Sequence, residues 1–127
     1  MADERREPDM SAPGERIATA LAAAHAFDIQ AVQERLREGT GGYEIVHESP
    51  GIEIGVYVLV APEPDRQQPH ADDEIYIVLE GTGMLDVAGK AVELRSGHAV
   101  FVPAGVEHRF SGYEQLSVLV IFERRRH

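Results

Sequence analysis

The chain has 127 residues, no cysteine, and 22 acidic against 12 basic side chains, for a formal net charge of −10. This length predicts a single domain with one core. The absence of cysteine excludes disulfides and thiolate metal ligands, and it makes a reducing cytoplasm the expected location. A surface this negative argues against nucleic acid as a partner. The sequence has no apolar run long enough for a membrane span and no signal-peptide pattern at its N-terminus.

The first forty residues predict a helical extension. Residues 1–13 are charged and contain proline, which is typical of a disordered lead-in. Residues 14–40 predict two short helices, of which the first is rich in alanine. The second has Asp28 as its N-cap and Gly39 as its stop signal. Apolar side chains recur at helical spacing in both, namely Ile17, Leu21 and Ala24 in the first and Ile29, Val32 and Leu36 in the second.

After residue 40 the sequence changes to strand-like alternation, and residues 41–127 predict an all-β domain. Short apolar runs recur about every ten residues and are separated by glycine and proline, which is typical of a sandwich or barrel. A hairpin turn is expected near Ala88 and Gly89. The basic run from Arg124 to Arg126 predicts a solvated tail. The expected strands cover residues 43–47, 52–60, 74–80, 83–94, 99–103 and 115–123.

The predicted strand that begins at Glu74 is apolar on both faces. Its two sets of alternating side chains are Glu74, Tyr76 and Val78 on one face and Ile75, Ile77 and Leu79 on the other. A strand buried on both sides needs a cover outside the barrel. A second subunit and the N-terminal helices are both candidates for that cover.

Two stretches concentrate residue types that bind metals. In QQPHADDEIYIVLEGTG, residues 67–83, His70 and Glu74 stand at the mouth of an apolar strand. In GHAVFVPAGVEHRFSG, residues 97–112, a Pro-x-Gly turn precedes His108, which starts the next predicted strand. A histidine beside a tight turn can be held rigidly, as a metal ligand requires.

These stretches resemble the two sequence motifs of the cupin superfamily. The first motif is glycine, five residues, His-x-His, three or four residues, glutamate, six residues and glycine. His70, Glu74 and Gly81 fit it. The second is glycine, five residues, Pro-x-Gly, two residues, histidine, three residues and asparagine, and it is matched without a gap by Gly97, Pro103, Gly105 and His108. The resemblance covers about residues 43–123 and implies a cupin jelly-roll barrel, or double-stranded β-helix, behind the helical extension.

The chain departs from these motifs at three positions, where Pro62 replaces the leading glycine, Gln68 the first histidine and Gly112 the asparagine. If His70 is aligned with the first histidine instead, Asp72 takes the second place, but Glu74 then follows too soon. The alignment with Gln68 is therefore preferred, and Asp72 is expected to be a solvated turn residue. On an extended chain Gln68 lies on the same side as His70. The resemblance thus implies that Gln68 is a weak fourth ligand, or reaches the metal through water, while Gln67 points away.

The resemblance implies one divalent metal ion per chain, either Fe, Mn, Zn or Ni, bound by His70, Glu74 and His108. Two imidazoles and one carboxylate are the ligands of non-haem iron sites, and they also suit the other three metals. Strand alternation places Tyr76 and Phe110 on the same face as these ligands, as walls of a substrate pocket. A bound cation would let an anionic molecule bind although the whole protein is acidic.

Two classes of function follow from the resemblance. The protein is expected to act on a small organic molecule, either as a dioxygenase-type enzyme or as an isomerase or lyase. The alternative is a non-catalytic cupin that binds a sugar or an organic acid, because cupins share a fold and differ in function. The resemblance also favours a homodimer, with the second subunit as the outer cover of the strand at 74–80. No residue in the sequence decides between these reactions.

Overall fold

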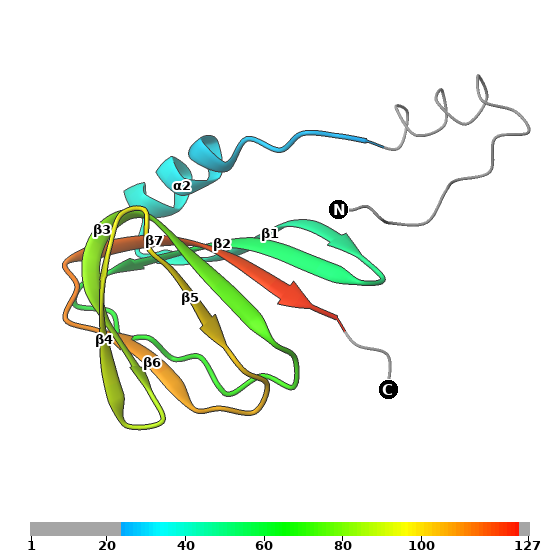
Figure 1. Cartoon of the computed structure of the whole chain (residues 1–127). Helices are drawn as coiled ribbons and strands as arrows, with labels where there is room; N and C mark the ends of the chain where they lie inside the picture. The colour runs from blue at the N-terminus through cyan, green and yellow to red at the C-terminus, as the bar shows by residue number, and fades with distance from the viewer. Residues whose placement is uncertain (1–23, 125–127) are drawn as a thin grey trace, which may run out of the picture.

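The computed structural model describes residues 24–124, which form one helix and seven β-strands (Figure 1). The helix is α2 (Ile29–Glu38). The strands are β1 (Gly41–Ser49), β2 (Ile52–Val60), β3 (Glu74–Val87), β4 (Lys90–Arg95), β5 (Ala99–Val102), β6 (His108–Ser111) and β7 (Gln115–Glu123). Every strand pair is antiparallel, in the order β1-β2-β7-β3-β4, and β5 and β6 also pair with β3. The prediction of an all-β jelly-roll barrel with a helix before it is confirmed.

The longest strand, β3, belongs to both halves of the barrel. Its first half pairs with β5 and β7, and its second half pairs with β4 and β6. A register shift between Val78 and Glu80 marks a bulge, which bends the strand. Gly81 follows with a φ of 93°, and a Cβ atom there would lie 2.1 Å from the carbonyl oxygen of Gln115. The break expected between residues 80 and 83 is therefore a bend within one strand.

The two halves of the barrel enclose an apolar core. Its members come from every strand except β1, and burying side chains of this size stabilises the fold by about 1.5–3 kcal/mol each. They are Leu59, Tyr76, Val78, Leu85, Leu94, Val102, Phe110, Leu116, Val118 and Val120. Glu74 and His108 are buried beside this core, so two polar side chains lie at the edge of an otherwise apolar interior.

Helix α2 begins and ends where the sequence predicts. The Asp28 carboxylate accepts a hydrogen bond from the Ala31 amide at 3.0 Å, and the Gly39 amide donates to the carbonyl of Leu36. Val32 of the helix belongs to a second apolar cluster, with Val56 and Val58 of β2. The helix therefore covers part of the outer face of the sheet.

The first predicted helix is not found in the residues that the structure describes. The lead-in and the helix up to residue 23 lie outside the described residues, and residues 24–27 are not helical. The prediction is wrong for these four residues because two of them, His25 and Phe27, pack their rings on β1. The rings of His25 and Phe27 lie 5.2 and 5.9 Å from the ring of His47. The described part of the chain contains no helix that is long and apolar enough to cross a membrane.

An apolar row crosses the outer face of the sheet beside α2. Ile54 of β2 pairs with Ile121 of β7, Ile121 pairs with Ile75 of β3, and Ile75 pairs with Phe101 of β5. Ile75 is 39% exposed and Phe101 is 57% exposed. No described residue therefore covers the β5 end of this row, which is the face for which the sequence predicts a cover.

Candidate metal centre

Backbone hydrogen bonds hold together the two segments that carry the predicted histidines. His70 lies in the loop before β3, and His108 is the first residue of β6. The turn between β5 and β6 is tied to the His70 loop twice. The Gly105 amide donates to the His70 carbonyl at 2.7 Å, and the Ala104 amide donates to Oδ1 of Asp73 at 2.8 Å. Segments far apart in sequence therefore present their side chains to one place.

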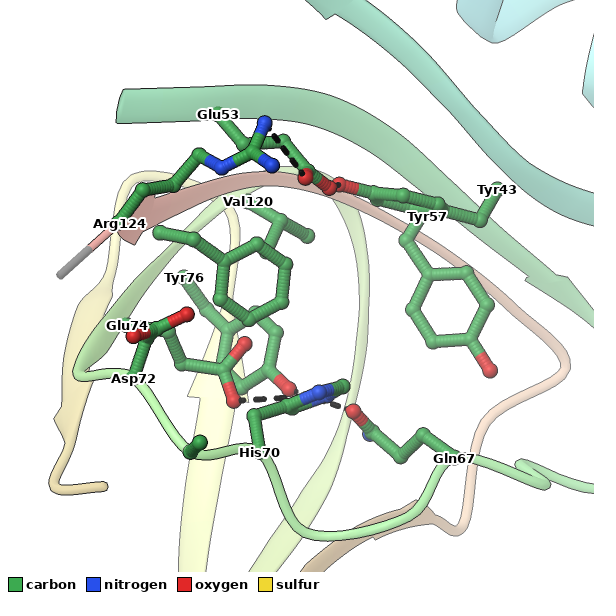
Figure 2. Close-up of a pocket in the computed structure, with 12 residues that line it drawn as sticks. Tyr43, Glu53, Tyr57, Gln67, His70, Asp72, Glu74, Tyr76, Val120 and Arg124 are labelled. Carbon is green, nitrogen blue, oxygen red and sulfur yellow. Dashed lines mark hydrogen bonds and ion pairs between the residues drawn. The ribbon is translucent and has the colours of Figure 1, made fainter. Parts of the chain in front are cut away.

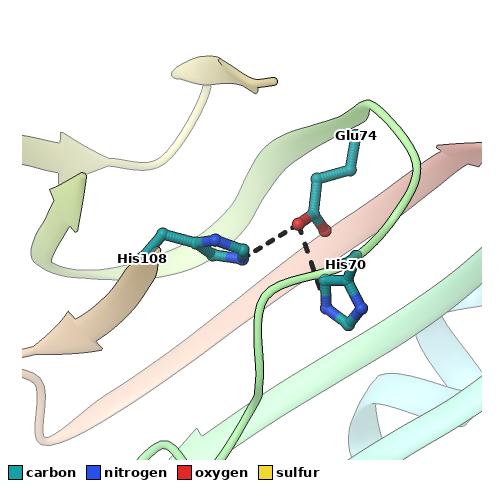
Figure 3. Close-up of side chains that lie close together, drawn as sticks. All are labelled: His70, Glu74 and His108. Carbon is teal, nitrogen blue, oxygen red and sulfur yellow. Dashed lines mark ion pairs between the residues drawn. The ribbon is translucent and has the colours of Figure 1, made fainter. Parts of the chain in front are cut away.

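His70, Glu74 and His108 form a compact cluster (Figure 3). Their nearest ligand atoms all lie within 4.8 Å of one another. Oε1 of Glu74 lies 2.9 Å from Nε2 of His108 and 4.0 Å from Nε2 of His70. The side chains of Glu74 and His108 are each 1% exposed, whereas that of His70 is 35% exposed. The cluster is thus closed on the His108 side and open on the His70 side.

The ring of His108 is oriented by its second nitrogen. Nδ1 donates to the Val106 carbonyl at 2.8 Å, which directs Nε2 toward Glu74. A hydrogen bond of this kind fixes the ring of a metal-binding histidine and leaves Nε2 as the ligand atom. Burial lowers the pKa of His108, but the hydrogen bonds to Glu74 and to Val106 outweigh burial and raise the pKa above its ordinary value. Without a metal, the Glu74 carboxylate therefore favours the protonated form of the His108 ring.

The geometry and chemistry of this cluster fit a divalent ion. Oε2 of Glu74 is buried and has no hydrogen-bond partner among the described residues. A buried carboxylate oxygen without a partner is costly, and a cation would satisfy it. Two donor atoms that lie about 2.1 Å from one ion at a right angle are about 3.0 Å apart. The 2.9 Å between Glu74 and His108, a hydrogen-bond distance in the metal-free site, is compatible with that spacing.

The structure places the two glutamines the other way round from the sequence-based expectation. Gln68 is exposed and does not line the pocket, whereas Gln67 does line it. Oε1 of Gln67 lies 3.2 Å from Nε2 of His108 and accepts a hydrogen bond from the Tyr76 hydroxyl at 2.7 Å. The expectation assumed an extended chain from residue 68 to residue 70. Residues 61–73 form an irregular loop instead, so strand alternation does not apply there.

Asp65 holds Gln67 in this position, although no sequence motif marks Asp65 as a site residue. The residue is 1% exposed, and its carboxylate accepts four hydrogen bonds. The donors are the Tyr57 hydroxyl at 2.6 Å, the Gln67 amide at 3.2 Å, Nε2 of Gln67 at 2.6 Å and the Phe110 amide at 2.8 Å. Asp65 lies among the five unspecified residues of the first cupin motif, so the motif does not single it out. The sequence offered one signal for this role, which is that Asp65 lies two residues before Gln67 in a loop that contains several prolines.

A cavity of about 460 Å³ opens on the exposed side of the cluster (Figure 2). Tyr57, Tyr76, Val120 and Phe122 form its aromatic and aliphatic wall, and Gln67, His70 and Glu74 line its polar side. Burial is the main cause that raises the pKa of the Tyr57 and Tyr76 hydroxyls, which therefore stay protonated as donors to Asp65 and Gln67. The structure places the predicted pocket residue Tyr76 on this wall. Phe110 lies behind it in the core, with its ring 4.8 Å from that of Tyr76.

Charged side chains surround the mouth of the cavity. Arg124 lies across the cavity from His70 and pairs with Glu48 and with Glu53, the latter at 3.8 Å (Figure 2). Two β-strand glutamates therefore hold Arg124 at the pocket mouth, and the rest of the predicted solvated tail, Arg125 and Arg126, lies outside the described residues. Asp72 lies half-buried in the bend before β3 and also lines the cavity. The three-residue metal-type cluster does not include Asp72.

The comparisons with known proteins agree with the fold. The sequence model of the Cupin domain family matches residues 56–122, which is more than half of the chain. The chain therefore belongs to the cupin family. Its His-His-Glu cluster makes it a cupin with a candidate metal site.

Three known proteins are similar to this chain over different lengths. An uncharacterized protein of Streptomyces coelicolor is 35% identical over 98 residues, which are 76% of this chain and 93% of that protein. The acireductone dioxygenase of Leishmania infantum is 36% identical over 76 residues, which are 54% of this chain and only 22% of the dioxygenase. A protein of Thermus thermophilus has a crystal structure that matches with a TM-score of 0.69 at 23% identity, over 81% of this chain and 100% of that one. This last likeness shows the fold alone.

Proposed function

We propose that the protein is a metal-dependent enzyme that binds one divalent ion through His70, Glu74 and His108. Its substrate in this proposal is a small organic molecule with oxygen atoms on two neighbouring carbons. An enediol or a 2-hydroxy ketone has this chemistry. The single observation that carries the proposal is the buried Oε2 of Glu74, which has no described partner and lies beside two histidines. Such an oxygen is well suited to a cation, and the cavity beside it is large enough for a small substrate.

The cluster leaves room for a substrate on one side. Two imidazoles and one carboxylate are the ligand set of many non-haem iron enzymes, in which the remaining positions are open. When bound, the ion supplies Lewis acidity toward a carbonyl or enol oxygen. His70 lines the cavity, whereas His108 is buried beneath it. A substrate would therefore approach from the side of His70.

The remaining wall residues orient the substrate and exclude water. Val120 and Phe122 present apolar surface, and the ring of Phe122 packs against His70 with centroids 4.8 Å apart. The hydroxyls of Tyr57 and Tyr76 already donate to Asp65 and Gln67, so these tyrosines contribute ring faces rather than bases. Arg124 at the mouth is the side chain that would bind an acidic group of the substrate, since an arginine can form a bidentate pair with a carboxylate.

An oxygenase reaction on an enediol is the first choice among the chemistries open to this site. It is supported by the ligand set and by the similarity of 76 residues to an acireductone dioxygenase, although these cover 22% of that enzyme. Isomerase or lyase chemistry would use the same ligands, because an enediol is also the intermediate between a 2-hydroxy ketone and its isomer. The alternative outside enzymology is a cupin that binds such a molecule without changing it.

Oxygen uptake by Fe(II)-loaded protein distinguishes these functions. A panel of enediols, catechols and β-diketones is offered in an oxygen electrode, with Glu74→Ala as the control. We expect uptake with the enediols that is lost in the variant. Deuterium exchange at the substrate carbon without oxygen uptake would indicate an isomerase instead. A rise in melting temperature with a panel compound, with neither reaction, would contradict the enzyme and support the binding protein.

A further inference from the structure

We propose that Gln67 supplies a fourth metal ligand through its amide oxygen, and that Asp65 is the positioning residue that turns this oxygen toward the ion. This inference rests on the proposed metal site. It concerns two residues of the loop between β2 and β3 that lie outside the His-His-Glu cluster. The amide would occupy the place that a histidine fills in the family motif, but from position 67 and not from position 68.

The hydrogen bonds of Gln67 allow one orientation of its amide. A carboxylate only accepts hydrogen bonds, so Oδ2 of Asp65, 2.6 Å away, requires the NH2 group of Gln67 on its side. The oxygen then faces the cluster, where it accepts from the Tyr76 hydroxyl at 2.7 Å. Asp65 cannot turn, because the Tyr57 hydroxyl and the buried Phe110 amide bind its two oxygens. The amide is therefore held at both ends before any ion binds.

The amide oxygen also lies close enough to His108 to share an ion with it. Oε1 of Gln67 lies 3.2 Å from Nε2 of His108, and Oε1 of Glu74 lies 2.9 Å from the same nitrogen. Both separations are close to the roughly 3.0 Å expected of neighbouring donors on one ion. Nε2 of His108 thus lies near one oxygen of Gln67 and one oxygen of Glu74. Gln67 and Glu74 are spaced from it alike, although they come from different parts of the chain.

An amide oxygen in place of an imidazole should change which metal is preferred. Oxygen ligands suit Mn and other hard cations, whereas imidazole suits Zn and Ni. A site with two oxygens and two nitrogens should therefore discriminate less against Mn than one with three nitrogens. Gln67 would set this preference, and Asp65 would maintain it.

A matched pair of substitutions in the full chain tests the ligand. Gln67→Leu removes the oxygen at nearly constant size, and Gln68→Leu makes the same change at the exposed neighbour. The affinities for Mn and Zn are measured by competition with a chelating dye, and folding is checked by circular dichroism. We expect Gln67→Leu to weaken Mn binding at least tenfold, or about 1.4 kcal/mol, and Gln68→Leu to change it less than about twofold. Equal affinities in the two variants would overturn the inference.

Gln67→His tests the same ligand in a way that does not depend on stability. The ratio of Zn to Mn affinity is measured within one variant. A loss of protein stability that weakens the binding of both metals equally therefore leaves the ratio unchanged. We expect this ratio to rise at least about tenfold. An unchanged ratio would show that residue 67 does not face the ion. If wild-type protein binds neither metal, the proposed metal site fails; if wild-type protein binds metal and both Gln67 variants match it, only the fourth ligand fails.

A double-mutant comparison tests the role of Asp65. Asp65→Asn offers Gln67 an amide that can also donate, so the Gln67 amide is no longer held in one orientation. We expect this change to weaken Mn binding in the wild-type background and to have no further effect on Mn affinity in a Gln67→Leu background. Equal losses in both backgrounds would show that Asp65 acts on the fold and not through Gln67.

Discussion

Truncation of Asp65 should destabilise the metal-free protein far more than its place in a loop suggests. The carboxylate accepts four hydrogen bonds and is 1% exposed. In Asp65→Ala, the Phe110 amide stays buried without an acceptor, which costs about 2 kcal/mol. The three donors of Tyr57 and Gln67 line the cavity and can bond to water instead, so together they lose about 2 kcal/mol. Relief of the buried charge returns about 1 kcal/mol, which leaves a net loss of about 3 kcal/mol.

Urea denaturation in the presence of a chelator measures this loss as a change in the free energy of unfolding. Glu63→Ala is the matched control in the same loop. The Glu63 side chain is 52% exposed and pairs with Arg66 at 3.7 Å, so its removal should cost less than about 0.5 kcal/mol. If Asp65→Ala costs less than about 1 kcal/mol, or no more than the control, the carboxylate does not hold the loop and the reasoning on Gln67 loses its support.

Three further predictions follow from the packing and charges. Because the pKa of His108 is raised in the folded protein, the Glu74–His108 pair should stabilise the metal-free protein fully below about pH 6.5. This stabilisation should be lost as the pH rises through the folded pKa of His108. Urea titrations with a chelator from about pH 5.5 to 8.5 measure it, and a free energy of unfolding that rises over this window would contradict the prediction. Metal affinity should change in the opposite sense and strengthen with pH, because the ion displaces the proton from His108, and a flat dye-competition profile would count against this ligand. We propose a homodimer through the uncovered apolar row at Ile75 and Phe101. Sedimentation should show a dimer at micromolar concentration, and Phe101→Asp should convert it to a monomer. A wild-type protein that is monomeric at this concentration would exclude the dimer.

Much of the barrel could be predicted because a strand imposes a period of two on its side chains. The bounds of the strands at 52–60 and 115–123 agree with those expected. The bend in β3 was predicted as a break between two strands, because the bulge shifts burial from even-numbered residues such as Tyr76 and Val78 to odd-numbered residues such as Leu85 while the backbone continues as one strand. The course of residues 24–27 also escaped prediction, because alanine-rich sequence favours a helix while the contacts of His25 and Phe27 with β1 decide the outcome.

The candidate site was predictable where motif spacing carried the information and not elsewhere. The structure brings together His70, Glu74 and His108, the three residues named from their spacing. The sequence pointed to Gln68 instead of Gln67 because side chains in a loop follow no fixed period. Their directions depend on individual hydrogen-bond partners, such as Asp65 for Gln67. The pairing of Arg124 with two glutamates was hidden for the same reason, since β1 and β2 supply the partners from more than seventy residues earlier in the chain.

Elemental analysis of the full chain purified without added metal tests the central claim most directly. The account predicts about one divalent ion per chain, as purified or after dialysis against Fe, Mn, Zn and Ni, because the fold already brings the three ligands together. Glu74→Ala and His108→Ala should lose the ion while they remain folded by circular dichroism. Less than about a tenth of an equivalent in wild-type protein after all four dialyses would contradict the metal site and every function proposed for it.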